Sequence, residues 1–323
     1  MDRGSRIYVA GHAGLAGSAI VRRLRAAGCE NLLLRRHAEL ELTDGQAVAD
    51  FFGREKPEYV FLAAAKVGGI LANDRYPAEF IQSNLAIQLN VIHEAWRAGV
   101  KRLVFLASSC IYPRDCPQPI RESYLLTGPL ESTNRAYAVA KIAGVEMCWS
   151  YNRQYGTRFL AVMPTNLYGL ADQYDLQNSH VLPALIRKVH EAKVAGAPAV
   201  TLWGSGRPRR EFLLSDDMAD ACVHLMGLPA AQFDPLVAPA EAPLINIGAG
   251  EDSSITELAR VIAEVVGYRG EFAYDASKPD GTPRKLLDVS RLAALGWRAR
   301  TPLKEGIALA YEDYLRRREQ ILR

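Results

Sequence analysis

The chain has 323 residues, of which 49% are hydrophobic and 23% charged, a composition typical of a globular protein with a large core. This composition excludes disordered, collagen-like and disulfide-stapled chains. The 39 lysine and arginine residues nearly balance the 36 aspartate and glutamate residues, so the charge does not indicate a nucleic-acid partner. The basic run Arg316-Arg317-Arg318 is typical of a solvated helix end.

Membrane and metal signals are weak in this sequence. The sequence contains no stretch of 18 apolar residues, which is about the length needed to cross a bilayer. The N-terminus shows no apolar segment typical of a signal peptide. We therefore expect a cytoplasmic protein that binds no membrane. The cysteines lack the spacing of a zinc site, so we expect reduced thiols and no metal. They are Cys29, Cys110, Cys116, Cys148 and Cys222.

Residues 6–170 alternate short apolar runs with longer helical patterns, which predicts a doubly wound parallel sheet covered on both faces. Gly28 and Gly156 are placed to end the first and the last of these helices. The expected strands are 6–10, 31–35, 59–64, 102–108 and 158–163, and the expected helices are 18–27, 45–55, 77–98 and 135–155.

The pattern loosens beyond residue 170, where prolines become more frequent. We expect domains over 1–170 and 171–323, the second one smaller and irregular, with the chain returning to the first near 211–228 and 244–250. The local expectations within this part are a turn over 204–210, strands over 211–214 and 244–247, and a helix capped by Ser215-Asp216-Asp217.

A glycine motif follows the first expected strand and opens into a helix. Gly11, Gly14 and Gly17 let the turn bend and let backbone amides approach a diphosphate at the positive helix end, with His12 and Leu15 in the same loop. A plain strand–helix turn is the alternative. Because the strand–glycine–helix context is complete, we interpret the motif as a dinucleotide site.

The end of the second expected strand carries Arg35, Arg36 and His37 and no acidic residue. An acid there would bind the ribose hydroxyls of NAD, whereas basic side chains would meet the 2′-phosphate of NADP(H), so NADP(H) is favoured. The alternative is that these charges are merely solvated. Leu42 and Asp44 could border the adenine, although Asp44 could equally cap a helix.

Tyr137 and Lys141 stand four residues apart on an expected helix, hence on one face. A tyrosine at its usual pKa of about 10 exchanges protons poorly at neutral pH, and a nearby ammonium stabilises the phenolate. Ser108, at the end of the fourth strand, would donate to the same carbonyl oxygen. The pair alone occurs by chance in many helices, but its context makes it specific.

The glycine motif, Ser108, Tyr137 and Lys141 together resemble the extended short-chain dehydrogenase/reductases that act on nucleotide sugars. Further segments are similar to the branch that epimerises and reduces GDP-4-keto-6-deoxy-D-mannose, over nearly the whole chain and least at 228–244. These segments are 63–70 (AAAKVGGI), 108–113 (SSCIYP), 163–169 (MPTNLYG), 178–180 (NSH), 203–206 (WGSG), 210–212 (REF) and 278–285 (KPDGTPRK).

The resemblance implies a Rossmann fold, NADPH as reductant and a homodimer. It also implies cofactor contacts from Lys141, Pro164, Asn166, Leu167 and His180. The substrate contacts that it implies are Lys188, Trp203, Arg210 and Asp280, of which Trp203 could instead belong to the core and Asp280 to a turn. Two positions depart from the family, which often has arginine at Ala13 and a basic residue at His37.

Epimerisation beside a ketone needs a base and an acid on opposite faces of the sugar, because the carbonyl acidifies the neighbouring C–H bonds. The resemblance assigns Cys110 as the base and His180 as the acid. Taken alone, Cys110 reads as a small buried hydrophobe and His180 as a cap or solvent-facing residue. Lys66 either borders the site or covers it.

Three other functions remain open at this point. A 4,6-dehydratase would carry Asp-Glu where this chain has Ser109-Cys110, and a simple C4-epimerase would hold NAD without a second acid–base pair. A non-catalytic redox sensor commonly lacks the tyrosine or the lysine. The helices 77–98 and 135–155 carry apolar residues on more than one face, which predicts that they form the dimer interface.

Overall fold

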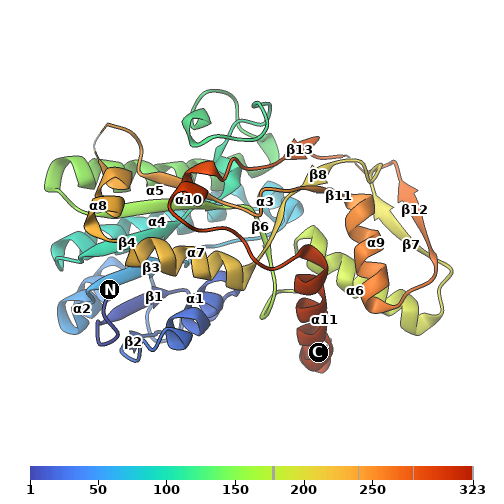
Figure 1. The fold of residues 1–323 in the computed structure, drawn as a ribbon, viewed down its shortest axis with the longest axis horizontal. Coiled ribbons are helices and arrows are strands. Elements are labelled where there is room, and N and C mark those ends of the chain that lie inside the picture. Colours follow the sequence, from blue (N-terminus) through green and yellow to red (C-terminus); the bar gives the residue numbers. More distant parts are fainter. Residues whose placement is uncertain (177–178, 239, 279, 322–323) are drawn as a thin grey trace.

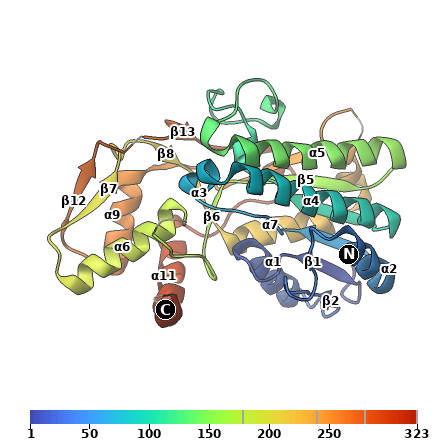
Figure 2. The same cartoon turned by 180° about the vertical axis from the view of Figure 1, so that it is seen from behind.

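The computed structural model describes residues 1–176, 179–238, 240–278 and 280–321 (Figure 1). Asn178 and Pro279, which belong to two of the segments quoted above, lie outside the described residues. Two lobes of unequal size lie side by side, and the larger one contains the N-terminus (Figures 1 and 2).

The larger lobe is built on a six-stranded parallel sheet in the order β10-β5-β4-β3-β1-β2. All of its strands except the short β2 are buried along their whole length, which explains their continuous apolar runs. The fold class predicted from the sequence is therefore confirmed. The strands are β1 (Ile7–Ala10), β2 (Leu32–Leu33), β3 (Tyr59–Leu62), β4 (Arg102–Leu106), β5 (Phe159–Pro164) and β10 (Leu244–Ile247).

Helices cover both faces of this sheet (Figures 1 and 2). One apolar cluster joins α1 (Leu15–Ala26) and α7 (Ser215–Gly227) to one face. A second cluster joins α2 (Gly45–Glu55), α4 (Pro77–Arg97) and α5 (Arg135–Tyr155) to the other. The four helices predicted in this region are all present, and their bounds differ from the prediction by at most three residues.

Two local predictions after residue 200 are wrong. Helix α7 begins at Ser215, and its N-cap is Leu214, so Ser215-Asp216-Asp217 form the first turn instead of the cap. The expected turn over 204–210 ends in strand β8 (Arg209–Arg210), which pairs with β11 (Ser253–Ser254) and β13 (Arg284–Lys285). Pairing with segments that are distant in the sequence decides this element, and local patterns do not show it.

The smaller lobe packs α6 (Val181–Ala195), α9 (Ile255–Val266) and α11 (Leu303–Ile321) around its own apolar core. The chain returns from it to the larger lobe with α7 and β10. Within the described ranges, no helix is both long and apolar enough to cross a bilayer. The remaining elements are α3 (Ile70–Arg75), β6 (Asn166–Tyr168), β7 (Ala199–Trp203), β9 (Phe212–Leu214), α8 (Ala230–Phe233), β12 (Glu271–Asp275), α10 (Ser290–Ala294), and the 3-10 turns Ser109–Ile111, Glu122–Tyr124, Ser132–Asn134 and Asp234–Val237.

Candidate active site

A cleft of about 760 Å³ opens at the carboxyl ends of the strands, where the strand order reverses between β1 and β3. In open α/β sheets this is the position at which ligands bind. The cleft brings together every predicted cofactor residue except Asp44, together with Ser108, Tyr137 and Lys66. The predicted residues along it are Gly11, His12, Gly14, Leu15, Gly17, Arg35, Arg36, His37, Leu42, Ser108, Tyr137, Lys141, Pro164, Asn166, Leu167 and His180.

The glycine loop between β1 and α1 fits a dinucleotide. Gly11 has φ +81°, and a Cβ atom there would lie 2.7 Å from the Ala64 Cα. A Cβ atom at Gly17 would lie 2.1 Å from the Gly11 carbonyl oxygen, so only glycine fits. No side chain caps α1 and no acidic residue stands in its first turn, which leaves the helix amides to an anion. The buried His12 Nδ1 has no partner among the described residues.

The basic residues after β2 are not equivalent. Arg35 donates to the Glu55 carboxylate (2.8 Å) and to the Leu34 carbonyl oxygen (2.9 Å). His37 lies 2.6 Å from Glu41. The Arg36 guanidinium lines the cleft, and in the described part of the chain no carboxylate forms an ion pair with it. Arg36 is therefore the basic side chain that remains available to a phosphate.

Asp44 caps helix α2. Its carboxylate accepts hydrogen bonds from the backbone N–H groups of Gln46 (2.9 Å) and Ala47 (3.1 Å), and it does not line the cleft. Of the two roles that the sequence left open for Asp44, the structure supports the helix cap, whereas Leu42 borders the cleft.

The end of β4 and helix α5 hold Ser108, Tyr137 and Lys141 around one point. Lys141 is buried and donates a hydrogen bond to the Leu106 carbonyl oxygen (2.8 Å), while its ammonium lies 5.8 Å from the Tyr137 ring centroid. Burial lowers the pKa of Lys141 to about 8. Burial raises the pKa of Tyr137, and the charge of Cys110 raises it further, although a hydrogen bond with Ser108 opposes this.

Lys141 was expected to lower the pKa of Tyr137, but in the protein alone this pKa is raised. Desolvation dominates, because the phenol is enclosed and the ammonium is engaged with a backbone carbonyl. A phenol that keeps its proton suits a group that donates one to a developing alkoxide.

Cys110 is buried beside the same point, in the short 3-10 turn after β4. Its backbone N–H lies 3.5 Å from Ser108 Oγ. Burial raises the pKa of the thiol, whereas the charge of Lys285, hydrogen bonding to Ser108 and the charge of Lys141 lower it. Two ammonium groups thus oppose the rise in pKa that burial causes, and so favour the thiolate.

Lys285 was missed by the sequence reasoning. It lies on β13 in register with Arg210 on β8, and burial lowers the pKa of its ammonium. In the described ranges, Lys285 forms no ion pair with a carboxylate. Lys285 lies in the segment 278–285, which resembles the family. A single lysine in that segment gives no sign that it lies near Cys110, which is distant in the sequence.

His180 occupies the N-cap position of α6, where its side chain makes no capping hydrogen bond. It lines the cleft from the smaller lobe and is solvent-exposed. Desolvation lowers the pKa of its imidazole. His180 thus has the backbone position of a cap, but its side chain is free to meet a ligand.

The four predicted substrate residues lie outside the lining of the cleft, in the smaller lobe. Trp203 is 51% exposed, which excludes the core alternative, and the Lys188 ammonium lies 5.0 Å from its ring centroid. Arg210 donates to the Thr282 carbonyl oxygen (2.6 Å). The Asp280 carboxylate accepts hydrogen bonds from the backbone N–H (2.7 Å) and the hydroxyl (2.6 Å) of the distant Ser205, so it joins two separate loops.

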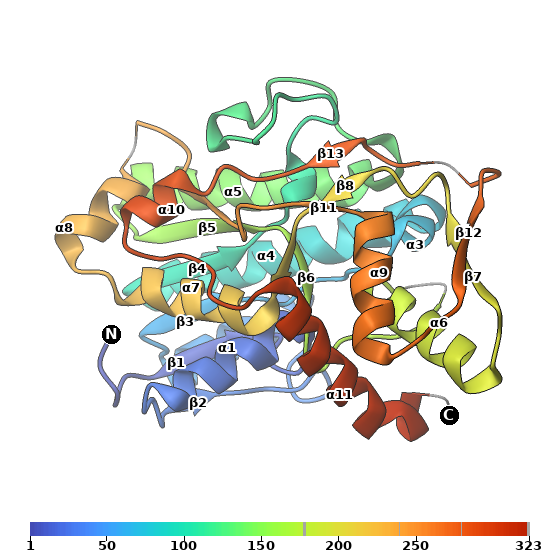
Figure 3. The same ribbon diagram turned by 45° about the vertical axis from the view of Figure 1, so that its right-hand side comes forward.

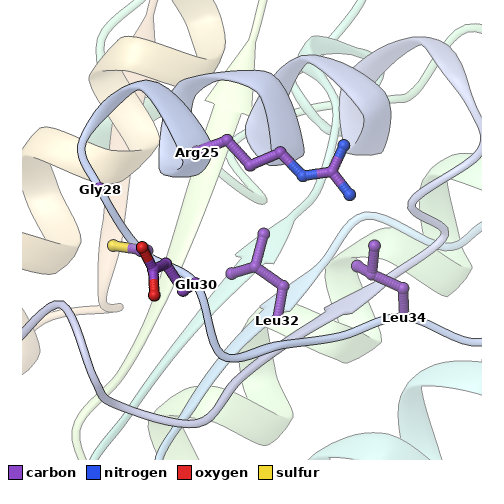
Figure 4. Close-up of a pocket in the computed structure, with 6 residues that line it drawn as sticks. Arg25, Gly28, Glu30, Leu32 and Leu34 are labelled. Atoms are coloured by element: carbon purple, nitrogen blue, oxygen red, sulfur yellow. The ribbon is translucent and has the colours of Figure 1, made fainter.

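A second hollow of about 400 Å³ lies at the far end of α1, beside Arg25, Gly28 and Leu32 (Figure 4). None of the predicted site residues lines it. Within the described residues, no cluster of three or more His, Cys, Asp or Glu side chains is arranged to hold a metal ion. Of the predicted catalytic residues, Ser108, Tyr137, Lys141 and His180 line the larger cleft, whereas the buried Cys110 is not part of its lining.

Comparison with known proteins matches residues 7–237 to the NAD dependent epimerase/dehydratase family. The chain is 54% identical to GDP-L-fucose synthase 1 of Arabidopsis thaliana, over 98% of this chain and 94% of that protein. It is 53% identical to GDP-L-fucose synthase of Escherichia coli K12, over 98% of each. A GDP-mannoheptose C4 reductase from Campylobacter jejuni, solved with NADP bound, superimposes with a TM-score of 0.88 at 42% identity, over 98% of this chain and 99% of that one. The protein belongs to the NAD dependent epimerase/dehydratase family.

Proposed function

We propose that this enzyme converts GDP-4-keto-6-deoxy-D-mannose to GDP-L-fucose, by epimerisation at C3 and C5 followed by NADPH-dependent reduction at C4. The observation that carries the proposal is the placement of Cys110 against Ser108, beside Tyr137 and Lys141. Reduction alone requires no thiol at this point. The names of the relatives that cover nearly the whole chain support the same substrate.

NADPH would lie along the cleft, with its diphosphate on the Gly11–Gly17 loop and its 2′-phosphate against Arg36. When bound it supplies a hydride to the sugar carbon C4. Pro164 at the end of β5 and Asn166 and Leu167 on β6 line the cleft, where they would border the nicotinamide. NADP in the reductase from Campylobacter jejuni supports this choice of cofactor.

For epimerisation, Ser108 and Tyr137 donate hydrogen bonds to the C4 carbonyl oxygen and so acidify the hydrogens on C3 and C5. Cys110 removes one of them through its thiolate, a minor form that the charges of Lys285 and Lys141 favour against burial. The electron pair moves into an enolate that the two hydroxyl groups stabilise. His180 then donates a proton to the opposite face of the carbon. The lowered pKa of His180 makes its imidazolium form a stronger acid, although less of this form is present at neutral pH.

For reduction, Tyr137 donates its proton to the C4 oxygen as that oxygen becomes an alkoxide. The buried Lys141 places a positive charge next to the phenol at the moment when the phenolate forms. The raised pKa of free Tyr137 keeps the phenol protonated until that step.

The second lobe is the proposed substrate domain, with the domain limits expected from the sequence. Lys188 and Trp203 form a cation and an aromatic face at its surface, which suit a phosphate and a guanine base. Arg210 could neutralise part of the diphosphate. Asp280 is engaged with Ser205, so its contribution would be to hold the loop of Trp203.

We further propose a cytoplasmic homodimer formed through α4 and α5. Their outer faces expose Leu85 (37%), Leu89 (54%) and Val139 (39%) after both helices have packed on the sheet. Pairing these faces across a two-fold axis would bury apolar surface that a monomer leaves in water.

The test is incubation of the purified protein with NADPH and GDP-4-keto-6-deoxy-D-mannose in deuterated water, followed by product identification. We expect one NADPH consumed per product, and GDP-L-fucose that carries deuterium at C3 and C5. Consumption of NADPH without deuterium and without inversion would show a C4 reductase only. No NADPH consumption in the presence of the sugar would favour the non-catalytic sensor.

A further inference from the structure

We propose that helix α11 positions His180 for proton return during epimerisation, and that Arg317, Asp313 and Tyr311 are the positioning residues. This inference rests on the proposed role of His180. Helix α11 lies along the smaller lobe and starts next to α7 and β6 of the larger one (Figure 3). It therefore contacts both lobes.

The start of α11 is fixed to the larger lobe. The Asp217 carboxylate on α7 accepts hydrogen bonds from the backbone N–H groups of Arg300 (3.0 Å) and Thr301 (2.8 Å) and from the Thr301 hydroxyl (3.0 Å). A Cβ atom at Gly306 would lie 2.1 Å from the hydroxyl oxygen of Tyr168, the last residue of β6. The helix thus begins in tight contact with the strand that carries Asn166 and Leu167.

Further along, α11 holds the chain that follows β6. Asp313 accepts a hydrogen bond from the Ala171 N–H (3.0 Å), and Arg317 donates to the Asp172 carbonyl oxygen (2.5 Å). The Tyr174 hydroxyl donates to the Ala310 carbonyl oxygen (2.9 Å). Ala171 stands at φ +65°, a conformation that L side chains rarely adopt. The contacts from α11 offset the cost of this backbone conformation.

The same contacts continue to α6, the helix that begins after His180. Arg187 on α6 donates to the Tyr174 carbonyl oxygen (3.1 Å). The His190 imidazole on α6 and the Tyr311 hydroxyl on α11 are hydrogen-bonded at 2.9 Å. His180 makes no side-chain cap of its own, so its placement follows that of α6. The position of His180 in the cleft therefore depends on α11.

The fold does not need these polar contacts for its core. Ile307, Ala310 and Tyr314 anchor α11 in the apolar cluster of the smaller lobe, and Lys304 pairs with Glu264 on α9. Removing Arg317 should leave the helix docked and free to shift by a fraction of an ångström. Such small displacements of a reacting group are costly in catalysis.

The principal variant is Arg317→Ala, and Lys304→Ala is the matched control, because it removes a cation from the same helix without touching 171–174 or α6. Tyr311→Phe, which removes one hydroxyl, is a second variant that should keep the fold. Circular dichroism and the Kd for NADPH from fluorescence titration should equal the wild-type values in all three. Arg317→Lys should restore part of the function.

The measured ratio compares hydrogen exchange with solvent at C3 and C5 against the amount of inverted product. We expect Arg317→Ala and Tyr311→Phe to raise this ratio by about tenfold, because Cys110 still removes the proton while His180 returns it more slowly. The control should keep the wild-type ratio. In a His180→Asn background, Arg317→Ala should add nothing. Equal losses of exchange, inversion and hydride transfer, or an effect of Arg317→Ala that persists without His180, would overturn the inference.

A chemical readout separates this inference from the proposed function. The rate at which diethylpyrocarbonate labels His180 is measured by mass spectrometry. We expect this rate to change severalfold in Arg317→Ala and to stay at the wild-type value in Lys304→Ala. If His180→Asn inverts the sugar at the wild-type rate, the proposed role of His180 fails, and the labelling still decides whether α11 positions the imidazole. An unchanged labelling rate would overturn the inference.

Discussion

The Arg35 guanidinium is held 2.8 Å from the Glu55 carboxylate, stacked 5.5 Å from the Phe51 ring centroid. Its neighbour Arg36 lines the cleft without a carboxylate in an ion pair, within the part of the chain that the structure describes. Adjacent arginines at the end of one strand thus have different surroundings. One is part of the wall of the cofactor site, and the other can meet a phosphate.

We therefore predict that Arg36→Ala raises the Kd for NADPH far more than the Kd for NADH, because only NADPH carries the 2′-phosphate. Arg35→Ala should weaken the binding of both cofactors to a similar extent, because Arg35 is part of the lining of the cleft. Arg54→Ala is the control, since Arg54 also pairs with Glu55 but lies outside the cleft. Fluorescence titration measures all three, and equal losses for both cofactors in Arg36→Ala would contradict the assignment.

A second prediction concerns the thiol of Cys110. The charge of Lys285 is the largest influence that lowers the pKa of this thiol against burial. We therefore expect Lys285→Met to shift the pH profile of Cys110 alkylation by iodoacetamide toward higher pH. The alkylation rate at each pH is measured by mass spectrometry. Lys278→Met, which removes a lysine near Trp203, should leave the profile in place. An unshifted profile in Lys285→Met would show that the thiol does not depend on this ammonium.

Burial pattern explains which elements could be predicted from the sequence. The strands of the main sheet other than β2 are buried on both faces and appear as apolar runs, and the predicted bounds of α2 and α5 are the observed ones. Short strands such as β8 depend on distant partners and have no periodicity of their own. The glycine loop, Arg36 and Ser108 follow the ends of strands, so their grouping at one edge of the sheet could be predicted from the order of the elements.

Pairings between distant segments could not be predicted in this way. Nothing near Arg35 in the sequence shows that Glu55 neutralises it, and nothing near Cys110 shows that Lys285 is its neighbour. The Tyr137 pKa is raised in the protein alone, where a lowered value was expected, because the spacing of residues on a helix does not report how deeply the phenol is enclosed.

A third prediction concerns the proposed dimer. Leu89→Glu places a charge at the centre of the exposed face of α4 and should give a monomeric mass in light scattering at micromolar concentration, whereas the wild type should be dimeric. Val194→Glu is the control, because Val194 is 72% exposed on α6, away from this face. A monomeric wild type would remove the basis of the proposal.

A fourth prediction concerns pH and stability. Burial raises the pKa of Asp172 to about 7, and Arg317 opposes this only in part. The folded protein therefore holds this proton more tightly than the unfolded chain, so stability falls as pH rises from about 4 to about 7 and then levels off. Asp172→Asn removes the dependence. Its gain in Tm over wild type should be small at pH 4 and large at pH 8, and a gain that is equal at both values would contradict the buried, protonated carboxyl.

The final prediction separates the proposed epimerisation from the proposed reduction. Cys110→Ala should nearly stop exchange of the C3 and C5 hydrogens with deuterated water, while slow hydride transfer to the unepimerised ketone yields a 6-deoxy sugar of the wrong configuration. Tyr137→Phe should block NADPH oxidation yet leave exchange measurable, because Ser108 still polarises the carbonyl and Cys110 still removes the proton. Cys148→Ala is the control for loss of a buried thiol, since Cys148 lies in the core. If Cys110→Ala exchanges deuterium at the wild-type rate, another group is the base, and Cys110 serves only to pack the turn after β4.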